Sequence, residues 1–446
     1  MAKQKKDSNL TMQERLEQGL IPNWDEPYKL PDNWCWTKLS MVSDVVTGCT
    51  PSKNIPAYYG DKIPFFKPAD LNAGRNTVIA SEYLSDDGKM VSRVIPEKST
   101  AVCCIGSIGK SGYLEVEGTT NQQINSLIPK INPLYLYYFV NTDTFINELR
   151  EKASATTISI VNKSKMETNK IPLAPLKEQQ RIVDNIESLF KKLDEAKEKA
   201  QEVIDGFEIR RAVILNKAFS GELTENWRKE NFIKYNGYKK KRFDEVATIK
   251  SNLVNPLEYL SYPHIAPDNI EKKTGVLLEY RTIEEDNVKS GKHKFYPGQI
   301  LYSKIRPNLS KVIMVDFEGL CSADMYPIEA IGDTRCLWYF MLSEKFLEQA
   351  ASAGSRSVLP KINQKELSVL TVTIPDLVDE QKEIVKILDS LLEKEYQVKQ
   401  IAETTIEQIE ITKKAILAKA FCGKLGTNEP AEESAKNLLK EIIKGN

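Results

Sequence analysis

The 446-residue sequence has no surplus charge, because 62 lysine and arginine residues balance 62 aspartate and glutamate residues. A chain without net charge does not attract a polyanion through its overall field, so any nucleic-acid contact has to come from local patches. No apolar run approaches the roughly 20 residues that a membrane-spanning helix needs. The lysines near the start lead into polar sequence and not into the apolar core of a signal peptide. We therefore expect a cytoplasmic protein.

Histidine and paired cysteine are scarce. The only histidines are His264 and His293, and none of the seven cysteines forms a C-x-x-C pair. This pattern argues against a zinc site and against a disulfide framework. Neither histidine lies near a nucleophile motif, so a hydrolytic triad is not expected. We predict no metal site.

Two stretches resemble catalytic motifs but lack parts of them. "CIGSIGKS" (104–111) resembles a phosphate-binding loop, but Cys104 replaces the first glycine and the residues that follow favour a strand where a helix is required. "NPLY" (132–135) resembles a motif of amino-methyltransferases, but the second proline and a glycine-rich cofactor loop are missing. Asn132 as a helix N-cap followed by Pro133 explains this segment better. We therefore expect a non-catalytic chain.

A long segment of the chain occurs twice. "VILNKAFSGEL" (213–223) and "AILAKAFCGKL" (415–425) are 202 residues apart, and this offset continues upstream without a gap. An Ile-Pro pair precedes each copy, and its proline forces an extended or turn conformation ahead of a helix. The sequence predicts two long helices that begin at about Leu176 and Val378. Gly206 within the first helix should cost about 1 kcal/mol relative to alanine.

Apolar residues recur along both predicted helices in alternating steps of three and four. This spacing predicts a left-handed coiled coil. A second apolar row beside the first leaves a face for a flanking domain or a partner. If the helices pair antiparallel, a pseudo-twofold axis relates the two halves of the chain, with one domain at each end. The predicted seam consists of Ile182, Ile186, Leu189, Leu193, Val203, Phe207, Ile384, Leu388, Leu391, Val398, Ile409 and Ile416.

The segments outside the helices predict two globular domains of mixed α/β (α+β) class. Short β-rich runs alternate with Gly, Pro and Asn turns, and a helix follows near the end of each segment. The layout repeats although most of the sequence does not. The expected parts are an N-terminal extension (1–31), a first domain (32–172), a central helix region (173–235), a second domain (236–375) and a C-terminal helix region (376–446).

Polar and basic loops occur at matched places in both domains. "TTNQQINS" (119–126) combines side chains that read base edges or bind phosphate, and a glycine loop precedes it. "SKIRPNLSK" (303–311) is a basic, polar loop in the second domain. A solvated surface loop explains any one of these residues equally well, but the matched places favour nucleic-acid binding. The predicted contacts are Lys53, Tyr58, Lys67, Ser107, Lys110, Thr120, Asn121, Gln122, Gln123, Ser303, Lys304, Arg306, Asn308 and Lys311.

The chain resembles the specificity subunits of Type I restriction-modification systems. The resemblance extends over nearly the whole chain, but the second domain lacks a clear "GxTPS…YYG" segment, which leaves 240–290 unassigned. The motifs that carry the resemblance are "GCTPSKNIPAYYGDKIPFFKPADL" (48–71), "GSIGKSG" (106–112), "IPLAPLKEQQRIVDNIESLF" (171–190) and "AFSGEL" (218–223).

The resemblance implies two target-recognition domains that read the two halves of a bipartite, asymmetric DNA site. It also implies two methyltransferase subunits docked on this chain, and restriction-translocase subunits that join for cleavage. S-adenosylmethionine, ATP and Mg²⁺ would belong to those partners, with no cofactor on this chain. Two other classes stay open. A coiled-coil scaffold would not need matched polar loops in both domains, and an enzyme would need a catalytic constellation.

Overall fold

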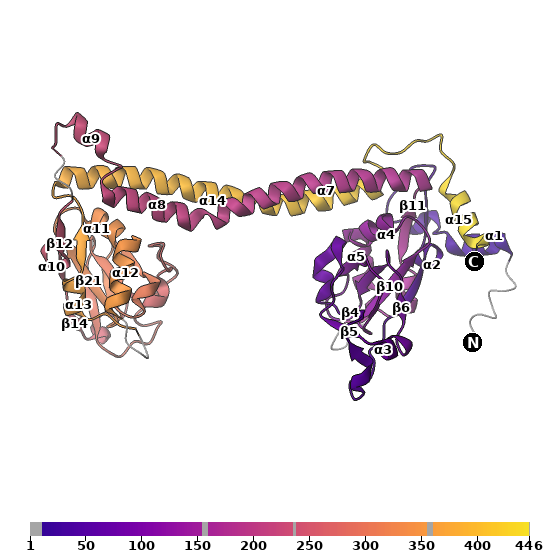
Figure 1. The fold of residues 1–446 in the computed structure, drawn as a ribbon, viewed down its shortest axis with the longest axis horizontal. Coiled ribbons are helices and arrows are strands. Elements are labelled where there is room, and N and C mark those ends of the chain that lie inside the picture. Colours follow the sequence, from indigo (N-terminus) through magenta and orange to yellow (C-terminus); the bar gives the residue numbers. More distant parts are fainter. Residues whose placement is uncertain (1–10, 154–158, 235–237, 355–359, 446) are drawn as a thin grey trace. The chain divides into compact units, whose positions relative to one another are not determined.

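The computed structural model describes residues 11–153, 159–234, 238–354 and 360–445. The chain divides into two compact units. Unit 1 combines Met1–Lys199 with Thr405–Asn446, and unit 2 is Ala200–Thr404. Each unit contains one mixed α/β domain together with parts of the long helices (Figure 1). The predicted fold class is therefore confirmed.

The domain of unit 1 is built on two larger sheets and one two-stranded ribbon. The four-stranded sheet has the order β2-β10-β7-β8, the five-stranded sheet the order β3-β5-β4-β9-β6, and β1 pairs with β11. A core cluster that includes Phe66 and Ile124 joins the two larger sheets. The strands are β1 (Cys35–Lys38), β2 (Ser43–Thr47), β3 (Tyr59–Gly60), β4 (Ile63–Phe66), β5 (Glu82–Leu84), β6 (Val94–Ile95), β7 (Thr100–Cys103), β8 (Ser111–Tyr113), β9 (Gly118–Thr120), β10 (Ile124–Pro129) and β11 (Lys170–Leu173).

Short helices cover and connect these sheets. Asn132 caps one of them, as predicted, because its side chain accepts hydrogen bonds from the amides of Leu134 and Tyr135. The helical elements of this domain are α1 (Met12–Gly19), η2 (Asn23–Asp25), α2 (Leu39–Val42), η3 (Pro56–Tyr58), η4 (Asp70–Asn76), α3 (Asp86–Met90), α4 (Pro133–Val140), α5 (Asp143–Glu151) and α6 (Lys163–Glu167), and α15 (Ala435–Lys444) packs on α1 and α2.

The domain of unit 2 repeats this plan. Its sheets have the orders β13-β21-β18-β19 and β14-β17-β20-β15-β16, and β12 pairs with β22. The strands are β12 (Lys240–Arg242), β13 (Ala247–Ile249), β14 (Leu253–Val254), β15 (Pro263–Ile265), β16 (Arg281–Thr282), β17 (Lys292–Phe295), β18 (Ile300–Ser303), β19 (Val312–Met314), β20 (Gly319–Cys321), β21 (Met325–Ala330) and β22 (Thr371–Thr373). The helical elements are α9 (Glu225–Glu230), α10 (Phe243–Val246), η5 (Pro256–Glu258), η6 (Pro267–Asn269), η7 (Pro307–Leu309), α11 (Thr334–Met341), α12 (Glu344–Ala353) and α13 (Gln364–Ser368).

The repeat accounts for the segment 240–290, which the sequence left unassigned. β15 pairs in parallel with β20, as β4 does with β9. The amide of Asn121, which follows β9, donates to Phe66 O at the end of β4 at 3.2 Å. The amide of Ser322, which follows β20, donates to Ile265 O at the end of β15 at 2.8 Å. The sheets differ at their rims, because β3 joins the edge strand β5, whereas β14 joins β17 at the opposite edge.

The long helices begin where the sequence predicts. They are α7 (Leu176–Asp205), α8 (Phe207–Ser220) and α14 (Val378–Phe421), the last with 44 residues. The first copy is divided at Gly206, so the expectation of one unbroken helix was wrong there. Arg210 Nη2 donates to Val203 O at 2.9 Å, and a Cβ on Gly206 would lie 2.4 Å from Arg210 Nη1. The missing side chain therefore makes room for this arginine.

Pairing of the long helices is antiparallel in each unit. In unit 1 Asp194 pairs with Lys413, and Lys197 Nζ lies 2.6 Å from Glu410 Oε1. In unit 2 Arg210 Nε lies 2.7 Å from Glu395 Oε2. Residue numbers fall along α14 as they rise along α7 and α8, which confirms the predicted direction. Figure 1 shows the helices side by side.

Part of the predicted seam packs against the domains and not between the helices. Ile182 and Ile186 are fully buried in the core of the first domain, and Ile384 and Leu388 in that of the second. The second apolar row, which includes Val183 and Val385, enters the same two cores. The flanking domains therefore occupy this face of the helices. Leu193, Val203, Leu391 and Ile416 are half-buried, and Phe207 and Ile409 are buried.

Two predicted seam positions lie on the outside. Leu189 is 36% exposed and Val398 is 45% exposed. Beside Leu189, Phe190 takes the inner position and packs edge-on against Tyr138, with the ring centroids 5.7 Å apart. Beside Val398, Lys399 lies over the ring of Phe207 at 4.9 Å. The seam prediction was wrong at these two positions because the neighbouring side chain makes the contact.

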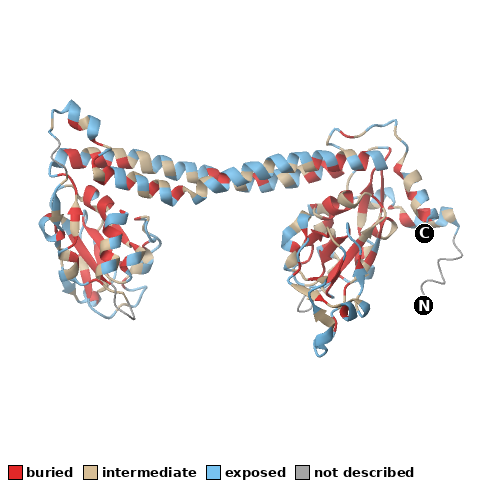
Figure 2. Ribbon diagram, in the orientation of Figure 1, coloured by how far each residue is buried: buried red, intermediate tan, exposed pale blue. Residues whose placement is uncertain are grey.

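A glutamate near the start of each long helix binds the segment that follows the end of the other helix. Glu178 accepts hydrogen bonds from Trp34 Nε1 at 2.7 Å and from Asn428 Nδ2 at 2.9 Å. Glu380, at the equivalent place, accepts bonds from Thr224 Oγ1 at 2.7 Å and Arg228 Nη1 at 2.6 Å. Figure 2 shows that buried residues gather in both domains and where the helices cover them. None of the helices in the described ranges is long and apolar enough to cross a membrane.

Candidate nucleic-acid interface

Three loops meet at one surface of the first domain. They are 48–58 after β2, 104–110 between β7 and β8, and 121–123 between β9 and β10. The Cys49 amide bonds to Thr120 O at 2.9 Å, and the Cys104 amide bonds to Gln123 O at 2.7 Å. A Cβ on Gly48 would lie only 2.2 Å from a backbone carbonyl of the third loop, so this approach requires glycine.

The predicted residues of the first domain differ in how far they reach solvent. Lys53, Ser107 and Gln122 are exposed, and Thr50 bonds to Gln122. Thr120 and Asn121 are buried, and Asn121 Oδ1 accepts the Gln123 amide at 3.1 Å, so this side chain shapes the turn. Lys67 is half-buried in a salt bridge with Glu82. The remaining predicted residues, Tyr58, Lys110 and Gln123, are half-buried.

A similar set of loops meets in the second domain. The loop 304–311 connects β18 to β19, the turn 322–324 connects β20 to β21, and residues 360–362 lie beside both. Arg306 has a φ of 47° in the left-handed region, and its amide bonds to Pro360 O at 2.7 Å. An arginine in this conformation is uncommon and is held there by its surroundings.

The predicted residues of the second domain also divide into exposed and engaged side chains. Arg306 and Asn308 are exposed, whereas Ser303 is buried and donates to Ile305 O at 3.1 Å. Lys304 Nζ donates to Ala323 O, and Lys311 Nζ donates to Pro267 O, at 2.5 and 2.7 Å. These two ammonium groups brace neighbouring loops.

The two interfaces share one backbone frame. In the first domain the amide of Cys104, which follows β7, donates to Gln123 O at 2.7 Å. In the second domain the amide of Lys304, which follows β18, donates to Asp324 O at 2.9 Å. The carbonyl of Cys104 accepts the amide of Val161 at 2.9 Å, and the carbonyl of Lys304 accepts the amide of Ile362 at the same distance. Side chains at the same place can therefore be compared. The equivalent residues are Cys104 and Lys304, Gln123 and Asp324, and Val161 and Ile362.

Two residues of the second interface were missed in the sequence. Lys361 Nζ lies 3.1 Å from Asp324 Oδ1, and Lys304 Nζ lies 3.7 Å from the same oxygen. Burial lowers the pKa of Lys292 nearby, and Asp324 opposes this shift. Lys361 arrives from a distant part of the chain, so its local sequence carries no signal. Alignment of Asp324 with Gln123 would have indicated the turn.

The chemistry of the interface suits binding and not catalysis. Burial raises the pKa of the Cys104 and Cys321 thiols to about 12, so neither forms a thiolate at neutral pH. Within the part of the chain that the structure describes, no group of three His, Cys, Asp or Glu side chains is placed to hold a metal ion. Exposed amide, hydroxyl and guanidinium groups remain, and groups of these kinds contact phosphates and base edges in protein–DNA complexes.

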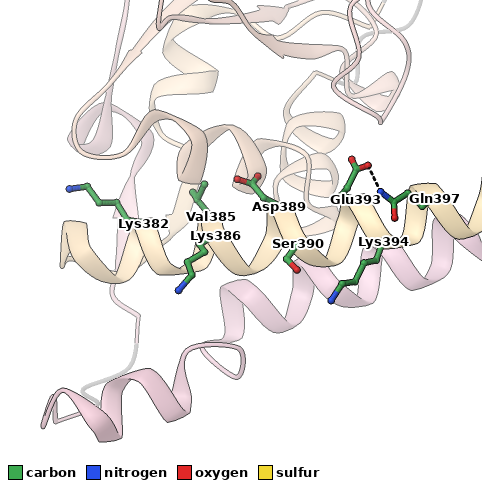
Figure 3. A pocket seen from close by; sticks show the side chains of 8 residues that line it. All are labelled: Lys382, Val385, Lys386, Asp389, Ser390, Glu393, Lys394 and Gln397. Atoms are coloured by element: carbon green, nitrogen blue, oxygen red, sulfur yellow. Dashed lines mark hydrogen bonds between the residues drawn. The ribbon is translucent and has the colours of Figure 1, made fainter.

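A second feature is a groove along α14 in unit 2, with a volume of about 620 Å³. Figure 3 shows Val385, Asp389 and Glu393 on the side of α14 that faces the domain, and Lys386 and Lys394 on the other side. Charges of both signs on one helix fit a protein surface better than a polyanion. The lining also includes Lys382, Ser390 and Gln397.

Comparison with protein families finds a match over most of the chain. The model described as "Type I restriction modification DNA specificity domain" matches residues 31–204 and again 235–410. The two matches correspond to the two domains with their long helices.

Curated relatives and solved structures agree with this match. The chain is 36% identical to the Type I restriction enzyme EcoDI specificity subunit of Escherichia coli, over 69% of this chain and 75% of that protein. It is 23% identical to the EcoKI specificity subunit of Escherichia coli strain K12, over 93% and 96%. The crystal structure of the HsdS subunit from Thermoanaerobacter tengcongensis has the same fold, with a TM-score of 0.60 at 19% identity, over 90% of this chain and 100% of that chain.

Proposed function

The chain belongs to the family of Type I restriction-modification specificity subunits, the non-catalytic subunits that recognise DNA target sites, and we propose that each domain reads one half of a bipartite, asymmetric site. The observation that carries this proposal is the loop frame that both domains share. The frame places different side chains at equivalent positions, which fits two unlike half-sites. The reading domains are residues 32–172 and 236–375.

Exposed or half-buried loop residues of the predicted set make the DNA contacts in this proposal. Lysine ammonium groups bind phosphates and position the protein, whereas amide and guanidinium side chains read base edges. Gln122 and Arg306 are exposed loop residues suited to base contacts, and Lys110 is suited to phosphate. Buried Thr120, Asn121 and Ser303 hold the loops in place.

The chain is part of a Type I restriction-modification complex, and its long helices offer the docking surface for partners. Isoleucines on the long helices are strongly exposed, Ile209 by 70% and Ile401 by 66%, and they offer apolar surface to a partner. We place two methyltransferase subunits along these helices and the α14 groove, and restriction-translocase subunits join the assembly for cleavage. S-adenosylmethionine, ATP and Mg²⁺ bind to those partners, and the complex works in the cytoplasm.

A domain exchange tests the division of labour. Residues 236–375 are replaced by the corresponding segment of another family member, and the chimera is produced together with a methyltransferase partner. Sequencing of methylated DNA should show a new second half-site and an unchanged first one. The reciprocal exchange of 32–172 is the control and should change only the first half. A scaffold without DNA reading would give no sequence preference in either chimera.

A further inference from the structure

The shared loop frame carries uncharged side chains in the first domain and charged side chains in the second. In the first domain its equivalent positions are Cys104, Gln123 and Ile160, which bear no charge. In the second domain the same positions are Lys304, Asp324 and Lys361. Lys361 is equivalent to Ile160 because Ile305 forms an antiparallel β-bridge with Lys361, as Ile105 does with Ile160. An ion pair thus replaces an amide where the turn reaches solvent.

Lys361 and Asp324 lie at the surface, and the less exposed Lys304 lies beside them. Both members of the pair keep 43% of their side chains exposed, whereas Lys304 keeps 20%. Lys304 also holds Ala323 O and lies over the ring of Tyr326 at 5.5 Å, which fixes the turn. A donor and an acceptor are therefore presented side by side, 3.1 Å apart, by the turn 322–324 and the segment 360–362.

We propose that Lys361 and Asp324 form a base-reading pair and that they read a G·C base pair in the second half-site. This inference rests on the proposed function, because it assumes that the loops of the second domain face DNA. In the major groove, guanine offers the acceptors N7 and O6, and cytosine offers the N4 donor beside O6. The ammonium of Lys361 matches the guanine acceptors, and the carboxylate of Asp324 matches the cytosine amine.

An A·T pair fits the same two groups less well. Its only donor, adenine N6, lies between two acceptors, adenine N7 and thymine O4. A carboxylate on that donor would face both acceptors, and one ammonium covers only one of them. The first domain carries Gln122 and Gln123 in this turn, and amide side chains of this kind are suited to adenine. The two domains therefore differ in the class of base pair that they prefer.

Single substitutions test the pair in the assembled complex. Lys361→Gln and Asp324→Asn are each produced with a methyltransferase partner, and the methylated sites are sequenced. Discrimination should fall by about 5- to 150-fold at one G·C position of the second half-site, with the first half unchanged. Lys361→Arg should keep the preference, because arginine also donates to guanine. Lys345→Gln, an exposed lysine on α12, is the matched control and should leave the profile unchanged.

Modified DNA tests the same contact without altering the protein. Each guanine of the second half-site is replaced in turn by 7-deazaguanine, which lacks the N7 acceptor, and binding of the wild-type complex is measured. One position should lose affinity, whereas inosine at that position, which keeps N7 and O6, should not. If no guanine is sensitive, or if the protein variants relax an A·T position or the first half-site, the inference is wrong.

The domain exchange separates this inference from the proposed function. If exchanging 236–375 leaves the second half-site unchanged, the domain does not read DNA and both ideas fail. If the exchange changes that half-site while Lys361→Gln and Asp324→Asn keep the original profile, only the base-reading pair fails.

Discussion

Replacing Glu380 by alanine should destabilise unit 2 by about 3–5 kcal/mol, the range for removing one partner of a buried salt bridge. The side chains of Glu380 and Arg228 are almost fully buried, and their charged groups lie 2.6 Å apart. The carboxylate also accepts bonds from Thr224 Oγ1 and Tyr238 OH, at 2.7 and 3.0 Å. The substitution therefore removes the charge opposite a buried guanidinium together with two further hydrogen bonds.

The equivalent substitution in unit 1 should cost less. Glu178 is buried as well, but its hydrogen-bond donors are the neutral groups of Trp34, Thr427 and Asn428. Glu178→Ala leaves no buried cation behind, so the loss is that of hydrogen bonds to a charged group, and about 1.5–3 kcal/mol is expected. The same residue type at the same place in the repeat should thus have two different costs.

The assay is urea unfolding of the full-length chain, read by hydrogen exchange of peptides from each unit. A thermal scan of the same variant gives a second readout, because a loss of 3–5 kcal/mol lowers the Tm of a unit of roughly 200 residues by about 6–20 °C. The double variant Glu380→Leu with Arg228→Met should lose much less than the sum of the single losses, because both charges are removed. Equal costs for Glu178→Ala and Glu380→Ala, or additive losses in the double variant, would refute the reasoning.

Three further outcomes are expected. Lys110→Ala should weaken binding to all DNA sequences alike, whereas Gln122→Ala should relax one half-site, and gel shifts with randomised duplexes should separate the two. Gly48→Ala should weaken DNA binding without unfolding the protein, because a methyl group at this position would push the loops 48–58 and 121–123 apart. Circular dichroism checks that the fold is kept. Gly206→Ala should stabilise the helix by up to about 1 kcal/mol, and the net gain is smaller by the free energy lost when Arg210 is displaced from Val203 O. Thermal unfolding measures the net change.

Local sequence signals predicted the helix boundaries and the two-domain plan well. The starts at Leu176 and Val378 follow from the Ile-Pro pairs, whose effect on the backbone does not depend on tertiary contacts. The division at Gly206 depends on where Arg210 reaches, and periodicity does not contain that information. Exposure of Leu189 has the same origin, because a neighbouring aromatic side chain took the inner position.

The candidate site was predicted only in outline. Loop positions such as Gln122 and Arg306 follow from residue type and from the matched order of the two domains. Burial of Thr120 was not foreseeable, because residue type alone does not show that Thr120 ends β9, a strand between β4 and β6. Lys361 was missed because it meets Asp324 only after the chain has folded.

The opposite placement of β3 and β14 bears on how new target preferences arise. Each is a two-residue strand added to one rim of an otherwise common sheet, at β5 in one domain and β17 in the other. Moving such a strand from one rim to the other alters few backbone hydrogen bonds and leaves the central strands in register. Evolution can therefore redraw the loops that lead into the rim while the sheet keeps its fold. Related proteins with this sheet should vary most in the stretch between the first strand and the parallel pair.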